Sequence, residues 1–358
     1  MNNVLHLNSN YADAFYAELF SSIKDRGYNN VVFVPQKIGF DDCPEAKNVI
    51  KSACYSMLDR FFLKRKSRKI FESVQEKVDL KNIDLIHAHS LYTCGVPAYY
   101  CYLKYKIPYV VSIRYNDVTD FPKYNPFSKK LIMKVLENAK SIVFITPLIQ
   151  KIAFKKFKIL NDDNIASKCH IVPNKISDCF LNENGPKAID KDKNLNILFV
   201  GRLVKIKRLE LLAKYCSKLF KEGDKLTVIT ASEGKPIKLL KKYDFIDFVG
   251  NVKHDELATY YRNADIFALI SKKETFGISY IESISQGTPI ILAKNQAIDG
   301  LFKDGVVGYS VNTKSYKDFN DKIHSILDNY LEMSTQCIEK SRDFSTDAIV
   351  DKLISLYL

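Results

Sequence analysis

Two glutamates, Glu274 and Glu282, stand with seven residues between them in the segment ETFGISYIE. Paired carboxylates can perform acid/base chemistry when they lie close enough to share a proton. Because Ile278, Ile281 and Ile284 recur at helical spacing, Glu282 is predicted inside a helix and Glu274 in the loop before it. The two carboxylates should therefore not share a proton. Each is better suited to binding a pair of hydroxyl groups through charge-assisted hydrogen bonds.

The start of this predicted helix offers a site for an anion. Gly277 lies where the backbone N–H groups of Thr275, Phe276, Gly277 and Ile278 can point at a phosphate. A carboxylate repels phosphate, so the two glutamates would contact other parts of the same ligand. The segment therefore predicts contacts in the order sugar hydroxyls, phosphate, ribose hydroxyls.

A group of cations follows an earlier strand, in LFVGRLVKIKRLELL. The strand is predicted to end at Gly201, where backbone can approach a ligand closely. Arg202 follows, and Lys207 and Arg208 open the next predicted helix, where the helix dipole disfavours cations. A bound phosphate or diphosphate would resolve this conflict, because side-chain cations and backbone amides would converge on it. The alternative is a solvated basic cluster.

These candidates need a scaffold, and the chain alternates short apolar runs with amphipathic stretches, which is typical of βα-repeating proteins. The predicted strands are NVLHL, VVFVP, DLIHAH, YVVSIR, SIVFIT and HIVPN in the first half, and NILFVG, KLTVIT, IDFVGN, DIFALIS, PIILA and GYSV in the second. We expect an α/β protein with two Rossmann-like, doubly wound domains facing a central cleft. Ligands should lie beyond the carboxyl ends of the strands.

Composition excludes several classes of protein. The chain has 358 residues, of which 46% are hydrophobic and 27% charged, which excludes a mainly disordered chain and allows two domains. No apolar run reaches the length of a membrane span, and the first residues, MNNVLHLNSN, do not resemble a signal peptide. The eight cysteines are scattered without a CxxC motif, which favours a reducing cytoplasm and disfavours a metal site.

The net charge of +13 is unevenly distributed. Residues 1–190 carry 28 Lys/Arg against 19 Asp/Glu, a balance of +9, whereas the remainder carries 26 against 22, a balance of +4. Three basic stretches with apolar residues, 60–69, 129–140 and 151–159, lie in the first half. They predict an anionic membrane surface as partner, and solvated helix faces are the alternative. No nucleic-acid-binding motif is visible.

Three segments, GRLVKIK, FVGNVKHDELATYYRNADIFALIS and ETFGISYIESISQGTPII, resemble the donor half of the retaining GT-B glycosyltransferases of family four, the glycosyl transferases group 1, of the bacterial surface-polysaccharide type. The family's hallmark is a glutamate pair with the spacing of Glu274 and Glu282, and residues 194–312 follow its order of motifs. Residues 181–194 are polar, with Gly, Pro and charged residues, and are predicted as a linker. The resemblance implies an acceptor-binding domain over 1–180, a donor-binding domain over 195–340 and a C-terminal helix, 341–358, that packs back on the first domain.

The resemblance also implies roles for the donor half. Arg202 and Lys207 would neutralise the nucleotide diphosphate, Glu282 would hold the ribose hydroxyls, and Glu274 the hydroxyls of the donor sugar. The implied donor-binding set is Gly201, Arg202, Lys207, Val249, Gly250, Asn251, Val252, Glu274, Thr275, Phe276, Gly277, Ile278 and Glu282, with 249–252 lining the base pocket. The family needs no metal or other cofactor, since arginine and lysine replace the cation. Transfer would retain the anomeric configuration, with the leaving diphosphate deprotonating the acceptor.

The N-terminal half departs from the family pattern. The loop after the first strand is NSNYADAFYAE instead of glycine-rich, Arg114 stands where many members carry histidine, and Lys175 stands where glycine is usual. Arg114, oriented by Asp117, is expected to face the donor sugar or the acceptor's phosphate and joins Glu274, Arg202 and Lys207 as a catalytic candidate. The acceptor-binding candidates are Asn8, Ser9, Asn10, His87, His89, Arg114 and Asp117. The alternatives are a structural Arg–Asp ion pair and structural strand histidines.

The sequence therefore predicts a cytoplasmic glycosyltransferase, peripheral on the inner face of the cell membrane. It would move a hexosyl or N-acetylhexosaminyl group from a UDP or GDP sugar to a lipid-diphosphate-linked glycan in capsule, O-antigen or exopolysaccharide synthesis. Nucleic acid is not an expected partner. A nucleotide-sugar epimerase or sugar phosphorylase of the same fold, and a non-catalytic nucleotide-sugar-binding or anion-binding protein, are the rival interpretations.

Overall fold

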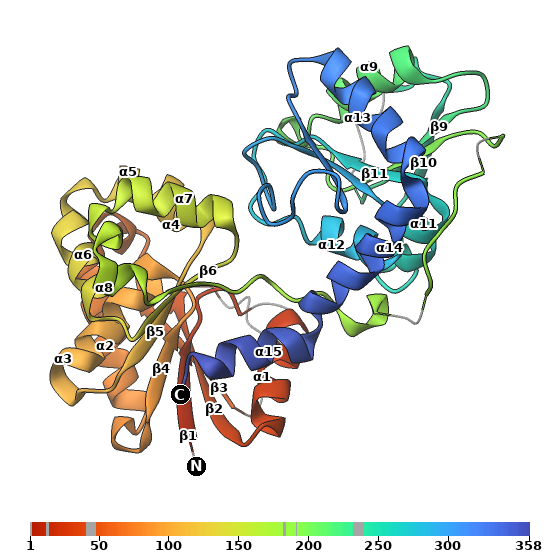
Figure 1. Cartoon of the computed structure of the whole chain (residues 1–358). Helices are drawn as coiled ribbons and strands as arrows, with labels where there is room; N and C mark the ends of the chain where they lie inside the picture. The colour runs from red at the N-terminus through yellow and green to blue at the C-terminus, as the bar shows by residue number, and fades with distance from the viewer. Residues whose placement is uncertain (1, 12–13, 41–47, 182–183, 191, 232–239) are drawn as a thin grey trace. The chain divides into compact units, whose positions relative to one another are not determined.

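The computed structural model describes residues 2–11, 14–40, 48–181, 184–190, 192–231 and 240–358. The chain divides into two compact units (Figure 1). The first unit comprises Met1–Pro173 together with Ile349–Leu358, and the second comprises Asn174–Ala348. The division at Pro173/Asn174 falls before the expected domain end at residue 180, so the polar stretch 181–194 belongs to the second unit.

The first unit is built on a seven-stranded parallel sheet with the order β3-β2-β1-β4-β5-β6-β7. Its strands are β1 Asn2–Leu7, β2 Tyr28–Lys37, β3 Val49–Tyr55, β4 Leu85–Ala88, β5 Tyr109–Ile113, β6 Ser141–Phe144 and β7 Cys169–Ile171. Six of them coincide with predicted strands; β3 was not predicted. Strands β4, β5 and β6 are buried along their whole length, which is why they appear in the sequence as continuous apolar runs.

Helices cover both faces of this sheet (Figure 1). They are α1 Ala14–Asp25, α2 Leu63–Lys77, α3 Val96–Tyr105, α4 Tyr115–Thr119, α5 Phe121–Tyr124, α6 Lys129–Asn138, α7 Pro147–Lys156, α8 Asp163–Ala166 and, from the other end of the chain, α15 Thr346–Ser355. Val350 and Leu353 of α15 enter the same core cluster as Val4 of β1 and Ile23 of α1. The last residues of the chain therefore complete the core of the first unit.

The second unit has a six-stranded parallel sheet with the order β10-β9-β8-β11-β12-β13. Its strands, all predicted, are β8 Asn196–Val200, β9 Lys225–Ile229, β10 Ile246–Gly250, β11 Ile266–Leu269, β12 Ile290–Ala293 and β13 Gly308–Val311. Its helices are α9 Leu209–Leu219, α11 Leu257–Asn263, α12 Ile278–Ser285, α13 Tyr316–Asp328 and α14 Tyr330–Ser341. Both units are thus doubly wound α/β folds, which confirms the predicted fold class.

Candidate functional site

The strand order of each sheet reverses at one point. In the second unit this point lies between β8 and β11, and in the first between β1 and β4. Doubly wound sheets bind ligands beyond the carboxyl ends of the strands at such a point. Gly201 and Arg202 directly follow β8, and Asn8 and His89 directly follow β1 and β4. Four predicted site residues, Gly201, Arg202, Asn8 and His89, therefore lie where this topology places ligands.

The loop after β8 is tied to the segment after β11. The backbone N–H of Lys272 donates to the carbonyl of Ile206 at 2.7 Å, and the ammonium of Lys207 forms an ion pair with the carboxylate of Glu274. Both side chains of this pair are largely withdrawn from solvent, with 17% and 11% exposed. Two predicted site residues that are far apart in sequence are thus in direct contact. The guanidinium of Arg202 is exposed and forms no hydrogen bond or ion pair with the described part of the chain.

Glu274 is fixed by its backbone as well as by its side chain. Its N–H donates to Oε1 of Gln296 at 3.2 Å, and its carbonyl accepts from the N–H of Ala297 at 3.2 Å. Its Oε1 accepts from the N–H of Thr275 at 3.3 Å. The loop after β12 therefore positions this carboxylate, a restraint that the local sequence around Glu274 does not reveal.

Helix α12 begins directly after Gly277, as predicted. Gly277 adopts φ +77°, and a Cβ added there would lie 2.5 Å from the ring of Tyr280, so only glycine fits this turn. The Tyr280 hydroxyl donates to the carbonyl of Leu269 in β11, which attaches the helix start to the sheet. The first amides of α12 can therefore point at an anion. Phe276 is 3% exposed, so only its backbone is available to a ligand.

Glu282 is a buried carboxylate with two side-chain partners. It is 4% exposed, its Oε2 accepts from the hydroxyl of Tyr261 at 3.0 Å, and its Oε1 lies 2.9 Å from Nε2 of His254. The His254 side chain is 57% exposed and packs edge-on against Phe180 with ring centroids 4.9 Å apart. Tyr261 and His254 were not predicted as site residues, although His254 follows the predicted base pocket by two positions.

Replacing His254 by alanine should weaken donor binding without removing it. The change deletes one hydrogen bond that orients Glu282, and a bond of this kind contributes about 0.5–1.5 kcal/mol. The dissociation constant for a nucleoside diphosphate, measured by calorimetry, should rise about two- to tenfold. The neighbouring exposed residue Lys253, replaced by alanine, is the matched control. An effect of equal size in both variants would contradict a role through Glu282.

The predicted base-pocket segment lies at the carboxyl end of β10. Val249 and Gly250 end this strand, and Asn251 and Val252 follow it. Gly250 has φ +87°, and the ladder between β10 and β9 is irregular between Phe248 and Gly250. The segment therefore turns away from the sheet at the same edge as Gly201 and Arg202.

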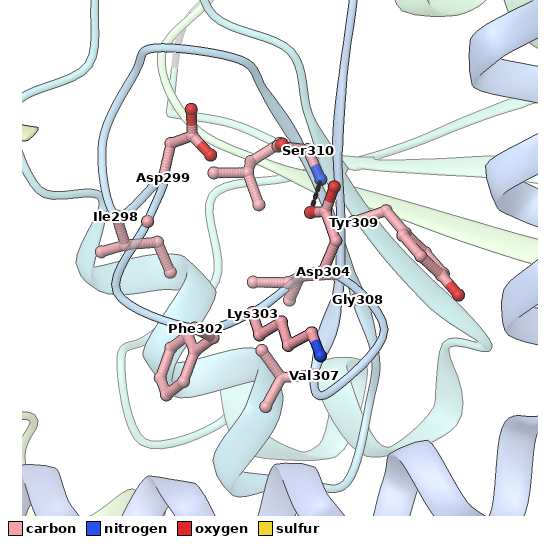
Figure 2. A pocket seen from close by; sticks show the side chains of 12 residues that line it. Ile298, Asp299, Phe302, Lys303, Asp304, Val307, Gly308, Tyr309 and Ser310 are labelled. Atoms are coloured by element: carbon pink, nitrogen blue, oxygen red, sulfur yellow. Dashed lines mark hydrogen bonds between the residues drawn. The ribbon is translucent and has the colours of Figure 1, made fainter.

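The recess between β12, β13 and the loop that joins them is a different feature (Figure 2). Ile298, Phe302 and Val307 line it, and Asp304 accepts the N–H of Ser310 at 2.9 Å. Its volume of about 10 Å³ is room for a single water molecule at most. It is therefore not a site for a nucleotide or a sugar.

In the first unit, a buried chain of hydrogen bonds ends at His89. Nδ2 of Asn30 donates to the carbonyl of Phe20, so Oδ1 of Asn30 faces Nε2 of His6 at 3.0 Å. His6 must therefore carry its proton on Nε2 and accept on Nδ1 from Nε2 of His89 at 3.1 Å. The Nδ1 atom of His89 is therefore a buried acceptor without a hydrogen-bond partner among the described residues. The Nδ2 atom of Asn8 is a buried donor that also has no hydrogen-bond partner among them.

His87 has a different environment from His89. Its Nδ1 lies 2.7 Å from the hydroxyl of Tyr357 and its Nε2 lies 2.9 Å from that of Ser112. Both ring nitrogens are thus engaged within the unit, which favours the structural alternative over the predicted acceptor contact. His6, His87 and His89 could be considered as metal ligands. However, the rings of His87 and His89 stack with centroids 4.0 Å apart, an arrangement that does not direct their lone pairs to one point.

The buried histidines should make the first unit sensitive to acid. Burial lowers the pKa of His6 from 6.5 to about 4, so the unfolded chain binds a proton below pH 6.5 that the folded unit does not bind. Stability attributable to His6 is therefore complete above pH 6.5 and falls as the pH drops toward 4. Between pH 7.5 and 5 this loss should amount to about 2 kcal/mol in urea unfolding.

The variant His6→Gln isolates this effect. Its loss of stability between pH 7.5 and 5 should be smaller than that of the wild type, whereas His324→Gln, at an exposed position of α13, should match the wild type. Burial raises the pKa of Asp117 to about 6, which acts in the opposite direction but equally in all three proteins. Equal acid sensitivity of His6→Gln and wild type would contradict the assignment.

Arg114 and Asp117 hold two loops together. The carboxylate of Asp117, 1% exposed, accepts the backbone N–H groups of Arg114, Leu91 and Tyr92 at 2.8, 3.1 and 3.3 Å. Nε of Arg114 donates to the carbonyl of His89 at 3.2 Å. Asp117 thus orients Arg114 through its backbone, and the half-buried guanidinium lies beside the loop that carries His89. Ser9 and Asn10 lie less deeply at the same sheet edge, where the N–H of Asn10 donates to Oδ1 of Asn8.

The sequence is similar to those of known glycosyltransferases. Residues 182–344 match the family model described as glycosyl transferases group 1. The chain is 23% identical to an alpha-monoglucosyldiacylglycerol synthase of Streptococcus pneumoniae over 71% of this chain and 60% of that protein. It is 25% identical to the enzyme of the same name from Acholeplasma laidlawii over 78% of this chain and 75% of that protein.

Solved structures extend the similarity to the whole fold. A sucrose-phosphate synthase from Thermosynechococcus elongatus superposes with a TM-score of 0.73 at 17% identity, covering 100% of this chain and 98% of that one. The Anabaena protein Alr3699/HepE in complex with UDP superposes with a TM-score of 0.70 at 13% identity, covering 99% of each chain. The chain therefore has the GT-B fold, and its residues 182–344 match the family model of the glycosyl transferases group 1.

Proposed function

We propose that this protein is a retaining glycosyltransferase that moves a sugar from a nucleoside diphosphate sugar to a hydroxyl of a glycan acceptor. The observation that carries the proposal is the contact between Lys207 and Glu274, beside the exposed Arg202 and the start of α12. Cations and helix amides suit a diphosphate, and the two carboxylates suit the hydroxyl groups on either side of it.

Different residues of the second unit bind different parts of the donor. Glu282, held by Tyr261, faces the ribose, the segment 249–252 receives the base, and Glu274 receives the hydroxyls of the sugar. Arg202 and Lys207 stabilise the charge that develops on the leaving diphosphate, so this reaction requires no metal ion. The diphosphate itself accepts the proton of the attacking hydroxyl on the same face of the sugar, which retains the anomeric configuration.

The first unit offers complementary groups for an acceptor hydroxyl. Nδ1 of His89 can only accept a hydrogen bond in the tautomer set by His6, and Nδ2 of Asn8 can only donate one. A hydroxyl group has the matching chemistry for either atom, because it can donate to Nδ1 of His89 or accept from Nδ2 of Asn8. Arg114, beside His89, adds a cation for an acceptor phosphate.

The proposed donor is a UDP or GDP sugar, and the proposed acceptor is a lipid-diphosphate-linked glycan for capsule, O-antigen or exopolysaccharide synthesis. The UDP complex of the Anabaena structure supports the nucleotide. The names of the two synthases, which refer to a glucosylated diacylglycerol, support an acceptor with a lipid anchor. An enzyme of this kind would act at the inner face of the cell membrane.

Thermal stability in the presence of UDP, GDP and their sugars tests the proposal. A ligand at a hundred times its dissociation constant should stabilise the fold by about 2.7 kcal/mol, which is a readily measured shift of the melting temperature. Absence of any shift across the panel would overturn the proposal. Consumption of the nucleotide sugar without an acceptor would favour an epimerase, and binding without turnover for any acceptor would favour a non-catalytic protein.

A further inference from the structure

The first unit exposes a set of large apolar side chains in one region. We define the apolar–basic patch as residues 37–40, 57–62 and 124–127. Eight of its side chains are exposed large hydrophobics: Ile38, Phe40, Met57, Leu58, Phe61, Phe62, Tyr124 and Phe127. Leu58 is 69% exposed and Phe127 is 97% exposed. Large apolar side chains that share a surface region in this way indicate an interaction site.

Side-chain contacts join the three segments of the apolar–basic patch. The ammonium of Lys37 lies 3.8 Å from the ring centroid of Phe40 and 3.9 Å from the sulfur of Met57. The guanidinium of Arg60 lies 5.6 Å from the ring centroid of Tyr124. Phe127 follows Tyr124 within the short turn Pro126–Ser128. The segments therefore form one surface although they are far apart in sequence.

The charge of this surface identifies the partner. The described residues 37–40, 48–69 and 120–130 carry eleven Lys/Arg against two Asp/Glu, a balance of +9. Asp59, within the patch, is buried and paired with Arg65 and Lys69, whereas Lys64 and Arg68 on α2 are exposed. Basic residues between exposed Phe, Leu and Met side chains match the headgroups and the acyl boundary of an anionic bilayer. Nucleic acid would satisfy the charges but not the aliphatic side chains.

The structure separates this region from the other two basic stretches of the sequence. In α6, Ile132, Val135 and Leu136 are buried, and in the α7 stretch Ala153 and Phe157 are buried. The other apolar residues of these two stretches are buried or half-buried and none is exposed, so these helices present ordinary solvated basic faces. Of the three predicted stretches, only 60–69 turns apolar residues outward, and it does so together with 37–40 and 124–127, which were not predicted.

The apolar–basic patch lies at the carboxyl edge of the sheet of the first unit. Its segments follow the carboxyl ends of β2, β3 and β5, and the strands of this sheet are parallel. Asn8 and His89 follow the carboxyl ends of β1 and β4, so both sets share one edge. We infer that the apolar–basic patch docks the first unit onto an anionic lipid bilayer and brings this edge to the membrane surface. A lipid-borne acceptor would meet the enzyme there, a consequence that rests on the proposed function.

No described helix is long and apolar enough to cross a membrane. The test is co-sedimentation of the full chain with vesicles at low salt. We expect binding to vesicles of phosphatidylcholine with phosphatidylglycerol, at least tenfold weaker binding to phosphatidylcholine alone, and release by salt, since counterions screen exposed charges. Absence of binding, or equal binding to both vesicle types, would overturn the inference.

Two sets of variants locate the contact. The triple variant Phe61→Ser, Phe62→Ser and Phe127→Ser should lose at least about tenfold in partition, since each side chain loses its transfer into the bilayer. The matched control Leu103→Ser with Leu331→Ser removes exposed apolar side chains elsewhere, at 49% and 56% exposure, and should bind as the wild type does.

Donor binding separates this inference from the proposed function. The triple variant should keep the thermal shift with nucleoside diphosphates, because that site lies in the second unit, and this also shows that the variant is folded. Undiminished vesicle binding by the triple variant would overturn the inference and leave the proposed function standing. If the wild type bound vesicles but showed no thermal shift with any nucleotide, the proposed function would be overturned and the inference would stand.

Discussion

Replacing Glu274 by glutamine should reduce kcat about 10²- to 10³-fold while changing donor affinity less than about tenfold. The substitution keeps the size and the backbone bonds to Gln296 and Ala297 but removes the negative charge. A preorganised charge or hydrogen-bond partner at a reacting centre contributes mostly in the transition state, and loss of one such group costs a factor of this size. Steady-state kinetics together with calorimetric donor binding would measure both quantities.

The contact with Lys207 needs its own control in this experiment, because neutralising Glu274 also releases the lysine. The double variant Glu274→Gln with Lys207→Met separates the two effects: if the carboxylate acts on the sugar, adding Lys207→Met should weaken diphosphate binding further. Glu332→Gln, at an exposed position of α14, should behave as the wild type. Unchanged turnover of Glu274→Gln would remove Glu274 from the catalytic residues.

The second unit of this protein could be predicted from sequence because its signals are local. All six strands of the second unit are short apolar runs between amphipathic stretches, and the turn into α12 requires a glycine at a φ of +77°. Spacing alone placed Glu274 in a loop and Glu282 in a helix, which the structure confirms. The partners of Glu282 could not be predicted, because Tyr261 and His254 reach it across the fold.

The first unit was harder to predict, because its signals depend on contacts between distant parts of the chain. Strand β3, Val49–Tyr55, mixes Lys51, Ser52 and Cys54 with its apolar residues, since it lies at the edge of the sheet and is only partly buried. The roles of His87 and His89 differ because of Tyr357 and His6, which come from opposite ends of the chain. Exposure of Phe127 or burial of Val135 depends on which side of each helix faces the sheet. Composition of a basic stretch does not determine that side.

Replacing Arg202 by methionine should weaken the binding of a nucleoside diphosphate about 10- to 100-fold and leave the binding of the bare nucleoside unchanged. A hydrogen bond to a charged group contributes about 1.5–3 kcal/mol, and the Arg202 guanidinium is exposed and unpaired within the described residues. Lys207 already has Glu274 as a partner. Lys207→Met should therefore have a smaller effect on affinity than Arg202→Met, because binding through the lysine must first disturb that ion pair.

Lys205 provides the matched control for these two cations. It lies in the same short turn, Lys205–Lys207, and is exposed, so Lys205→Met changes the net charge of the loop by the same amount. If general electrostatic attraction held the diphosphate, all three variants would weaken binding equally and the loss would vanish at high salt. If Arg202 contacts the diphosphate directly, its loss should persist at high salt and Lys205→Met should bind as the wild type does. Equal affinities of Arg202→Met and wild type for the diphosphate would refute the assignment of this loop to the donor.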